Sequence, residues 1–464
     1  MQANQEIMQI IYNTAKPFDQ LLKKQKMRKG ETYRPMYYVV EQPVDEGLLL
    51  YHTMTKALLL LTPEETEIYR KDPTALPQLI ELWFLVPQSH DDRLLSRQIR
   101  DVAKIIKEKS TAITSYTILT TTDCNARCFY CYEKGRPRVP MSEETAIRTV
   151  DYIIKHSNGE RVSLHWLGGE PLYNKKVITL ITERLQKSSI EVSSDMISNG
   201  YLFNDETVTE AKELWKLKRV QITLDGTERT YNRCKAYIYK GVNPYRIVIS
   251  NIHRLLDKGI RVAIRLNIDI HNADNLTKLV EELHEEFHNS NGLIVYLHQL
   301  FEDSKGSVAM HKAEKRNDIF QKMIELENQL TNYGLRKKSG LKYQVKVNRC
   351  MADNDHSVVV FPQGNIGKCQ HYTENNFIGH ICNEQMDNNV IKEFKEVREI
   401  DECNRCFNFP DCFWLNMCED QPHCYPEERQ YLHHTTLQKM LESYARFKNK
   451  NIQDNEMQDD EIQD

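Results

Sequence analysis

The feature that most constrains the fold of this 464-residue chain is a regular alternation of short β-branched runs and amphipathic helical patterns between residues 113 and 300. Six runs have the composition of strands, over residues 113–121, 161–168, 193–199, 219–226, 261–269 and 292–300. Strands that alternate with helices form a parallel sheet with helices outside it. We therefore predict an α/β fold, and six strands suit a partial (β/α)6 TIM-like barrel. Ligands of such barrels bind at the C-terminal ends of the strands, so the residues that follow each strand are the candidates for chemistry.

The barrel also sets the boundaries of the other segments. Before it, two strand-like runs are followed by helical patterns, which predicts a compact domain with strands first and helices second. The predicted segments are an N-terminal helical extension (1–29), this strand-then-helix domain (30–108), the barrel (109–303), a helical linker (304–349), a cysteine-rich domain with little regular structure (350–447) and a disordered acidic tail (448–464).

Composition excludes several classes of protein. The chain is 40% hydrophobic and 28% charged, which is typical of a soluble globular protein. No apolar run reaches the roughly 20 residues that cross a bilayer, and the N-terminus lacks a basic start and a cleavage site, so we expect a cytoplasmic protein with no membrane partner. Its 62 basic and 66 acidic residues nearly balance, which argues against nucleic acid as a partner.

The twelve cysteines point to metal binding, because cytosolic thiols are kept reduced. Three of them, Cys124, Cys128 and Cys131, directly follow the first predicted strand. Three thiolates in a tight loop can hold three corners of a four-iron cluster and leave the fourth iron open to a cofactor or substrate. A structural zinc needs four ligands, and no fourth Cys or His lies in this loop.

This Cys-x3-Cys-x2-Cys loop, with Tyr130 just before its last cysteine, resembles that of the radical S-adenosylmethionine enzymes. The other strand ends fit the resemblance: Gly168-Gly169-Glu170-Pro171 is similar to the family's GGE motif, and Ser198-Asn199-Gly200 to its Ser/Thr-Asn-Gly element. The fourth predicted strand ends in Leu224-Asp225-Gly226, and the fifth carries Arg265 and Asn267. The resemblance implies that S-adenosylmethionine is bound by Tyr130, Gly168, Gly169, Glu170, Ser198, Asn199, Arg265 and Asn267.

The resemblance also implies a reaction. A reduced [4Fe-4S] cluster passes one electron to the sulfonium of S-adenosylmethionine, which releases methionine and a 5′-deoxyadenosyl radical that abstracts hydrogen from carbon. An electron donor such as flavodoxin or ferredoxin is then required. The protein positions the cofactor and excludes water and oxygen.

The C-terminal cysteines resemble the SPASM domain, an extension that holds auxiliary iron–sulfur clusters in peptide-modifying radical enzymes. The pattern departs from the family at one place, where five residues instead of three follow Cys412. The resemblance implies a first auxiliary cluster on Cys350, Cys369 and Cys418 and a second on Cys403, Cys406, Cys412 and Cys424. The fourth iron of the first cluster is either open to a substrate thiolate or bound by Cys382. A zinc ribbon at Cys403 and Cys406 is the alternative.

The N-terminal domain resembles the winged-helix elements that bind the leader of a precursor peptide, with the leader adding a strand beside residues 37–40 or 48–51. A cap over the barrel is the alternative. The resemblance implies a ribosomal-peptide maturase that installs a crosslink in a precursor peptide, with a cysteine thioether as one form of it. The alternatives are an anaerobic sulfatase maturase that forms formylglycine and a non-enzymatic, zinc-stabilised binding protein. Cys234 has no assigned partner and is predicted to be a small buried hydrophobe.

Overall fold

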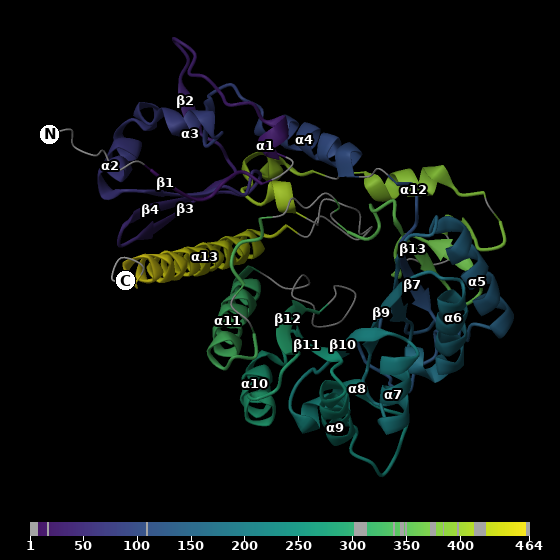
Figure 1. Ribbon diagram of the computed structural model, residues 1–464. Coiled ribbons are helices and arrows are strands. Elements are labelled where there is room, and N and C mark those ends of the chain that lie inside the picture. The colour runs from purple at the N-terminus through teal and green to yellow at the C-terminus, as the bar shows by residue number, and fades with distance from the viewer. Residues whose placement is uncertain are drawn as a thin grey trace. The chain divides into compact units, whose positions relative to one another are not determined.

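A computed structural model gives the structure of the chain (Figure 1). It describes residues 8–15, 18–107, 110–300, 313–336, 339–343, 348, 350–371, 377–383, 385–396, 399–412 and 424–460. The chain divides into two compact units. The barrel unit comprises Ser110–Lys337 and Cys350–Glu396, and the flanking unit comprises Met1–Lys109, Lys338–Arg349 and Val397–Asp464. The predicted cysteine-rich segment 350–447 is therefore divided between the two units.

The barrel unit contains the predicted parallel sheet. Its strands are β7 (Ser115–Leu119), β8 (Val162–Leu167), β9 (Val192–Ser198), β10 (Leu217–Thr223), β11 (Arg261–Ile268) and β12 (Leu293–Gln299). Each pairs in parallel with the next, in chain order. The intervening helices are α5 (Glu143–His156), α6 (Lys175–Lys187), α7 (Asp205–Glu213), α8 (Glu228–Lys235), α9 (Pro244–Asp257) and α10 (Ala273–Phe287). The α/β fold and its six strands are confirmed.

The two faces of this sheet differ in polarity, which explains why apolar and polar residues alternate along its strands. Tyr116 of β7 is fully buried, and its ring meets the Tyr152 ring of α5 at 6.5 Å, so this face packs on the helices. The opposite face carries polar side chains. Ser115 Oγ lies 3.2 Å from His165 Nε2, and His165 Nδ1 lies 2.9 Å from Asp195 Oδ1. This polar face is the inner, concave side on which a TIM-like sheet binds its ligands.

Three short strands extend the sheet beyond β7. They fall within residues 350–447, for which the sequence predicts little regular structure. They are β13 (Ser357–Val360), β14 (Asn365–Gly367) and β15 (Gly379–His380). β13 pairs in parallel with β7 and is buried along its whole length, because its apolar residues cover an edge that would otherwise stay unpaired. The prediction missed β13 because its partner lies more than 200 residues earlier in the chain. Helix α11 (Ala313–Asn332) lies within the predicted linker 304–349, and α12 (Asn388–Lys395) completes the unit.

The flanking unit is built on an antiparallel sheet of order β1-β5-β4-β3. Its strands are β1 (Gln9–Tyr12), β3 (Val39–Val44), β4 (Gly47–His52) and β5 (Leu58–Leu61), beside a pair formed by β2 (Tyr33–Pro35) and β6 (Leu85–Pro87). Its helices are α1 (Phe18–Leu21), α2 (Pro63–Lys71), α3 (Pro77–Glu81), α4 (Asp92–Lys107) and α13 (Pro426–Asp460). Helix α2 begins with a capping box, in which Thr62 and Glu65 satisfy each other's backbone N–H groups.

Both faces of this sheet are covered by helices. On one face Leu48, Leu59 and Leu61 pack with Leu79 beside α2 and α3. On the other face, Leu58 and its neighbours pack against Met440 and Tyr444 of α13. This explains why β5 is a run of four leucines, since a strand that is buried on both faces has no polar side. The C-terminal helix is thus part of the same core as the N-terminal sheet (Figure 1).

Two terminal predictions are corrected. The predicted helical extension 1–29 contains strand β1, because Ile10, Ile11 and Tyr12 favour a strand and the edge of β5 is available to pair with it. Only the four residues of α1 are helical there. The predicted disordered tail 448–464 is helical through Asp460, because α13 contains no glycine and no proline after its first residue. Residues 461–464 lie outside the described part of the chain.

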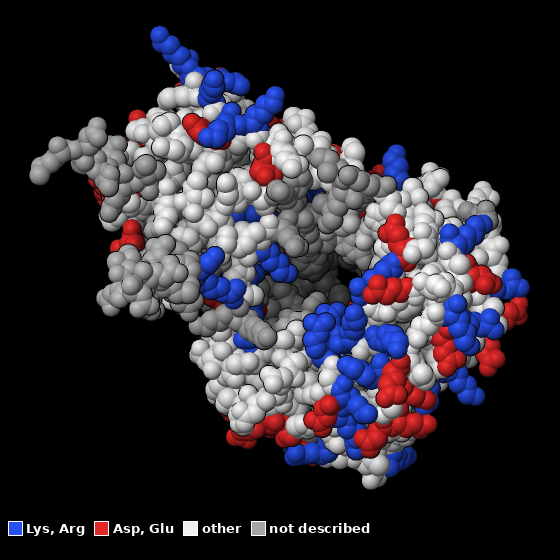
Figure 2. All heavy atoms as spheres, in the orientation of Figure 1, with Lys and Arg blue, Asp and Glu red and all other residues white. Residues whose placement is uncertain are grey.

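Charge is unevenly distributed over the surface. On the face drawn in Figure 2, Lys and Arg side chains gather on the barrel unit over the place that β10 occupies in Figure 1. The net charge of −4 therefore conceals a local basic surface. In the part of the chain that the structure describes, no helix is long and apolar enough to cross a membrane.

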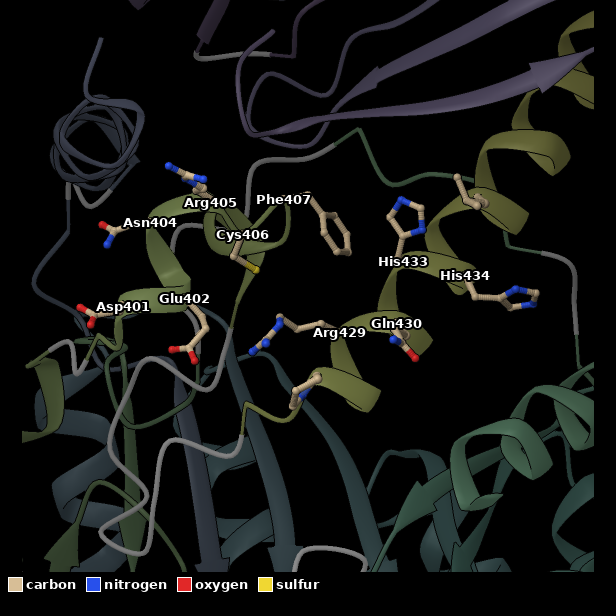
Figure 3. Close-up of a pocket in the computed structure, with 12 residues that line it drawn as sticks. Asp401, Glu402, Asn404, Arg405, Cys406, Phe407, Arg429, Gln430, His433 and His434 are labelled. Carbon is tan, nitrogen blue, oxygen red and sulfur yellow. The ribbon is translucent and has the colours of Figure 1, made fainter. Parts of the chain in front are cut away.

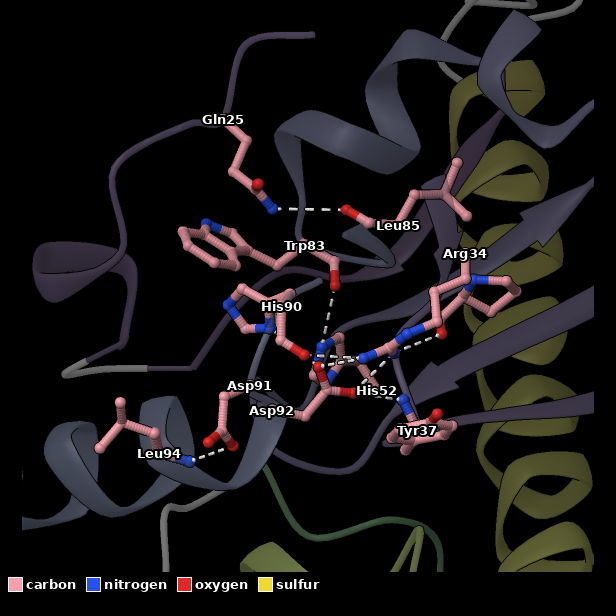
Figure 4. Close-up of polar contacts among 11 residues, drawn as sticks. Gln25, Arg34, Tyr37, His52, Trp83, Leu85, His90, Asp91, Asp92 and Leu94 are labelled. Atoms are coloured by element: carbon pink, nitrogen blue, oxygen red, sulfur yellow. Dashed lines mark hydrogen bonds and ion pairs between the residues drawn. The ribbon is translucent and has the colours of Figure 1, made fainter. Parts of the chain in front are cut away.

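A buried ion pair fixes the start of α4 in the flanking unit (Figure 4). Arg34 Nη1 and Nη2 each lie 3.0 Å from an oxygen of Asp92, which also accepts a 2.8 Å hydrogen bond from the Tyr37 backbone N–H. Burial alone would raise the pKa of Asp92, but the hydrogen bonds from His90 and Arg34 lower it. The Asp92 carboxylate therefore stays charged and joins β2, β3 and α4.

His52 of β4 makes the stability of the flanking unit depend on pH. Burial lowers the pKa of His52 from 6.5 to about 3, and its Nε2 lies 3.2 Å from the Trp83 carbonyl oxygen. Because the unfolded chain takes up this proton below pH 6.5 and the folded chain does not, the stabilisation is complete above pH 6.5 and is lost toward pH 3. We expect the free energy of unfolding to fall by about 1.4 kcal/mol per pH unit below this value. Urea titrations read by hydrogen exchange in β4 and β5 measure it, and His52→Phe should remove this slope. An equal slope in both proteins would contradict the assignment.

Candidate functional site

The three cysteines of the predicted cluster loop lie directly beyond the C-terminal end of β7. The loop turns tightly, with the Cys131 N–H donating to the Cys128 carbonyl at 3.2 Å and the Ala126 N–H to Cys124 Sγ at 3.3 Å. Burial raises the pKa of Cys124 to about 12 and also raises the pKa values of Cys128 and Cys131. Buried thiolates therefore need a positive charge close to the sulfur atoms, which the irons of a bound cluster would supply.

Asn125 provides a second indication that the loop fits an iron–sulfur cluster. Its Oδ1 accepts a 2.6 Å hydrogen bond from Asn199 Nδ2, whereas its own Nδ2 is buried without a partner among the described residues. Such a donor beside Cys124 can bond to sulfur of a cluster. Among the described residues no three His, Cys, Asp or Glu side chains gather closely enough for a single metal ion. A four-iron cluster holds its thiolates farther apart than one ion does, so this spacing does not conflict with it.

Gly168 and Gly169 bring the end of β8 against the cluster loop. A Cβ atom on Gly168, whose φ is +138°, would lie 2.1 Å from the Thr121 carbonyl oxygen, and one on Gly169 would lie 2.4 Å from that of Asp123. The Gly169 and Glu170 N–H groups donate to the same two carbonyls at 3.0 and 2.9 Å. Any side chain at these positions would push the two segments apart.

Glu170 joins the ends of β8 and β9. Its fully buried carboxylate accepts hydrogen bonds of 2.8 Å from Ser198 Oγ, 2.8 Å from the Asn199 N–H and 3.2 Å from the Leu172 N–H. Burial raises the pKa of Glu170 to about 7. The structure thus brings Glu170, Ser198 and Asn199 together, and all contacts of the carboxylate that it describes are with protein donors. Its predicted contact with the cofactor's ammonium remains a proposal.

A second buried network surrounds Tyr130, and its central residue, Lys235, was not predicted. Lys235 Nζ lies 2.7 Å from the Tyr130 hydroxyl and 3.0 Å from Asp225 Oδ2, and only 4% of Lys235 is exposed. The Tyr130 hydroxyl donates to Asp225 Oδ2 at 2.6 Å. The sequence does contain a signal, because Lys235 comes four residues after the buried Tyr231 and therefore lies on the same face of α8.

Arg265 and Asn267 of β11 extend this network. Asn267 Nδ2 donates to Asp225 Oδ1 at 3.1 Å, and Arg265 Nε donates to Asn267 Oδ1 at 2.8 Å. Arg265 Nη2 lies 2.8 Å from His298 Nδ1. Burial lowers the pKa of His298 to about 4, so its ring is uncharged beside the Arg265 guanidinium. The predicted residues Tyr130, Arg265 and Asn267 therefore converge, while a contact of Arg265 with the cofactor stays a prediction.

A cavity of about 340 Å³ opens beside this network. Tyr130, Asp225 and Asn267 line one side of it, and Cys234 and His271 line another. Cys234 was predicted to be a small buried hydrophobe, but it is half-buried and faces this cavity. The cavity lies at the C-terminal ends of the strands, where barrels of this kind bind ligands.

The cysteines assigned to the first auxiliary cluster are only partly described. Cys350 is exposed and precedes β13, and Cys369 is half-buried and follows β14, so the hairpin of these two strands separates them. Cys382 is exposed, with its sulfur 3.3 Å from Arg148 Nη1 of α5. Cys418 lies outside the described residues. The assignment of this cluster remains a prediction.

The other C-terminal cysteines lie in the flanking unit. Cys403, Cys406 and Cys412 pack in one cluster with Met36 and Tyr38 of the N-terminal segment. Arg93 Nη1 lies 2.9 Å from the Glu399 carboxylate, and Thr53 Oγ1 donates to the Phe407 carbonyl at 2.6 Å. The N-terminal domain thus supports the cysteine segment directly. Neither of its two predicted roles, a leader-binding element or a cap over the barrel, would require this contact.

Cys424 lies at the start of α13, near Cys403 and Cys406. Arg429 Nη1 donates to its sulfur at 3.1 Å. A cavity of about 930 Å³ lies beside them, and in Figure 3 Cys406 and Phe407 face Arg429 and His433 across it. A half-buried arginine beside these sulfur atoms would stabilise thiolates that bind a metal cluster.

Comparison with known proteins supports the barrel assignment. A sequence profile described as the Radical SAM superfamily matches residues 118–301. The chain is 27% identical over 169 residues to the Fe-coproporphyrin III synthase of Methanosarcina barkeri, covering 36% of this chain and 40% of that protein. It is 28% identical over 183 residues to the probable GTP 3′,8-cyclase of Archaeoglobus fulgidus, covering 39% and 57%. The chain thus spans about half the length of the curated relatives it matches.

The fold is also similar to that of solved structures. The structure of anSMEcpe with bound AdoMet matches with a TM-score of 0.55 and 16% identity, covering 72% of this chain and 94% of that one. The structure of anSMEcpe with AdoMet and the Kp18Cys peptide matches with a TM-score of 0.55 and 17% identity, covering 72% and 98%. The profile match begins in β7 and ends just beyond β12, so it includes the cluster loop, Glu170 and the Lys235 network. Residues 118–301 of the chain therefore match the radical SAM superfamily, and the barrel unit has the fold seen in these enzymes.

Proposed function

We propose that this enzyme is a peptide maturase that removes a hydrogen atom from a carbon of a precursor peptide and crosslinks that carbon, with a cysteine thioether as one form of the bond. Cys124, Cys128 and Cys131 would hold the [4Fe-4S] cluster that binds S-adenosylmethionine. When bound, these groups supply the carbon radical that abstracts the hydrogen. Asn125 would donate to the cluster, which is supported by its buried and unpartnered Nδ2.

The protein's own groups would hold the cofactor in the cavity beside Tyr130. Gly168 and Gly169 keep the cluster loop close to the end of β8, and Asn267 presents its amide beside Asp225. Lys235 balances the buried charge of Asp225, so the polar wall of this cavity is fixed before the cofactor arrives. Such preorganisation lowers the cost of ordering the site on binding.

The auxiliary sites are proposed on the same grounds. Cys403, Cys406, Cys412 and Cys424 would hold one further [4Fe-4S] cluster, since three of them share one apolar cluster and the fourth lies near two of them. Cys350, Cys369 and Cys418 would hold another, with its fourth iron either open or bound by Cys382. These sites are of the SPASM type and belong with enzymes that modify peptides.

The observation that carries the peptide assignment is the open edge of β3. Among the strands that the structure describes, β3 pairs only with β4, through a hairpin whose two-residue turn is flanked by Val44 and Gly47. Hydrogen-bonded pairs alternate along such a ladder, so the backbone groups of Val39, Glu41 and Pro43 point away from β4. The Val39 N–H donates to the Met36 carbonyl and Pro43 has no N–H, which leaves the Glu41 N–H as the outward donor of this edge. A leader strand would pair here by β-augmentation.

Glu41→Pro tests this assignment, because it removes the outward N–H without touching the ladder to β4. Proline is tolerated at outward positions of edge strands, as Pro43 shows, so the fold should persist. We expect affinity for a leader-bearing precursor peptide to fall by roughly tenfold or more. Glu41→Gln is the control, because the Glu41 side chain accepts a 2.6 Å hydrogen bond from Tyr69. Peptide affinity equal to that of the control would remove β3 from the leader site.

A sulfatase-type maturase that oxidises a Cys or Ser to formylglycine is the second candidate. One observation favours it: the structure of anSMEcpe with the Kp18Cys peptide shares the fold over 98% of its own length. More than a quarter of this chain lies outside that match, however, which favours an additional element such as a leader site. Mass spectrometry of a modified cysteine peptide separates the two. A thioether retains the sulfur and loses two hydrogen atoms, whereas formylglycine loses the sulfur.

A further inference from the structure

Aromatic and apolar side chains lie exposed beside the cluster loop. The Tyr201 and Tyr239 rings stack at 4.8 Å between centroids, and Tyr173 hydrogen-bonds to Tyr239. Tyr173 is 38% exposed and Ile238 46%. We call Tyr173, Tyr201, Ile238 and Tyr239 the tyrosine patch. Exposed apolar and aromatic groups that gather in this way usually mark an interaction surface.

The tyrosine patch is joined directly to the cluster loop. The Ile238 N–H donates to the Asn125 carbonyl at 2.9 Å, and the Arg127 N–H donates to the Lys235 carbonyl at 2.8 Å. Tyr173 is close enough to Asp123 and Cys124 to feel their charges. A protein bound on the patch would therefore be separated from the first cluster cysteine by about one layer of side chains.

The segments that form this surface are strongly basic. Residues 229–256 contain six Lys and Arg residues and no acidic residue. Three of the six pair with acids outside this segment: the buried Lys235 with Asp225, Arg246 with Glu228 and Arg254 with Asp205. The cluster loop and the residues after it, 124–140, contain four basic residues and a single acid, Glu133. Lys240 and Arg127 are exposed, so part of this charge faces the solvent. A partner that fits here has aromatic or apolar contacts at its centre and acidic groups at its rim.

We propose that the tyrosine patch is the docking surface for a small acidic electron-carrier protein. The inference rests on the proposed function, because only reductive cleavage of S-adenosylmethionine consumes electrons at this loop. The carrier would be oxidised by one electron, and S-adenosylmethionine would be reduced as its C5′–S bond breaks to give methionine and the 5′-deoxyadenosyl radical. Electron transfer needs a short path, and the patch contacts the cluster loop directly through the hydrogen bond from the Ile238 N–H to the Asn125 carbonyl. Interfaces of this kind are small and transient, which suits a carrier that must leave after each turnover.

Two substitutions test the docking surface. Ile238→Asp places a charge in the apolar part, and Lys240→Glu reverses a rim charge. The matched controls are Ile154→Asp and Lys187→Glu, which change an exposed isoleucine and an exposed lysine on helices α5 and α6. Each protein is reconstituted anaerobically and given a flavodoxin that is kept reduced by its NADPH-dependent reductase, or dithionite alone. The readouts are formation of 5′-deoxyadenosine and direct binding of the flavodoxin by calorimetry.

We expect both patch variants to bind flavodoxin roughly tenfold more weakly than the controls and to lose flavodoxin-driven cleavage in proportion. The effect of Lys240→Glu should shrink as the salt concentration is raised, because salt screens charges. The Debye length is about 10 Å at 0.1 M and shortens at higher ionic strength. Cleavage driven by dithionite should stay unchanged, since this reductant needs no docking surface. Equal flavodoxin affinity in patch and control variants, or no flavodoxin-driven cleavage in a protein that dithionite activates, would overturn the proposal. Absence of cleavage with dithionite in the unsubstituted protein would instead refute the proposed function.

Discussion

Anaerobically reconstituted protein in which Cys124, Cys128 and Cys131 are replaced by alanine is expected to hold about eight irons, where the unsubstituted protein holds about twelve. In the proposed assignment the three residues would hold one four-iron cluster, and the C-terminal cysteines would hold the other two. Iron and sulfide analysis with electron paramagnetic resonance measures the difference.

Cys234→Ala is the matched control, because Cys234 is a cysteine of the same unit that faces a cavity and is not counted as a ligand. It should retain the full iron content. Zinc in the C-terminal sites of protein produced without oxygen would contradict the auxiliary clusters and favour a zinc-stabilised C-terminal region.

Lys235→Met is expected to destabilise the barrel unit by about 3 to 5 kcal/mol, because it leaves the Asp225 carboxylate buried without its cation. Asp225 is only 2% exposed, and its Oδ2 lies 3.0 Å from Lys235 Nζ. The loss of local stability can be measured by hydrogen exchange of the β10 and β11 amides. The double variant Lys235→Met with Asp225→Asn removes both charges and should recover part of the loss. Loss of less than about 1 kcal/mol would show that the pair is not a determinant of stability.

Much of the barrel could be predicted from the sequence because its signals are local. Each strand is a short β-branched run followed by a helical pattern, and the candidate site residues lie in or just after the C-terminal halves of the strands. Gly168 and Gly169 are an example: their close approach to Thr121 and Asp123 follows from the lack of a Cβ atom. The convergence of Glu170 and Ser198 follows from their position after neighbouring parallel strands.

The features that were not predicted depend on contacts between distant parts of the chain. Lys235 lies 105 residues from Tyr130, and only the folded sheet brings the two to 2.7 Å. Strand β13 is too short to stand out in sequence and forms because β7 has a free edge. Helix α13 joins the N-terminal core through Met440, although its sequence closely follows the cysteines. In each case the partner, and not the local pattern, determines the structure.

The cysteine segment and the N-terminal sheet have related roles in this account. Cys403 and Cys406 pack on the same core as Met36 and Tyr38, so removing residues 30–108 would also disturb the proposed second auxiliary site. Truncation cannot therefore separate leader binding from cluster binding. The point variant Glu41→Pro changes the edge of β3 and the hydrogen bond from Tyr69, leaves the cysteine segment in place, and so avoids this problem.

The most direct measurement of the central claim is the reductive cleavage of S-adenosylmethionine. Reconstituted protein given S-adenosylmethionine and dithionite without oxygen should form 5′-deoxyadenosine and methionine. The protein with Cys124, Cys128 and Cys131 replaced by alanine should form neither product. If the unsubstituted protein carries the predicted clusters and forms no 5′-deoxyadenosine above the level of this variant, the chain is not a radical S-adenosylmethionine enzyme in its chemistry.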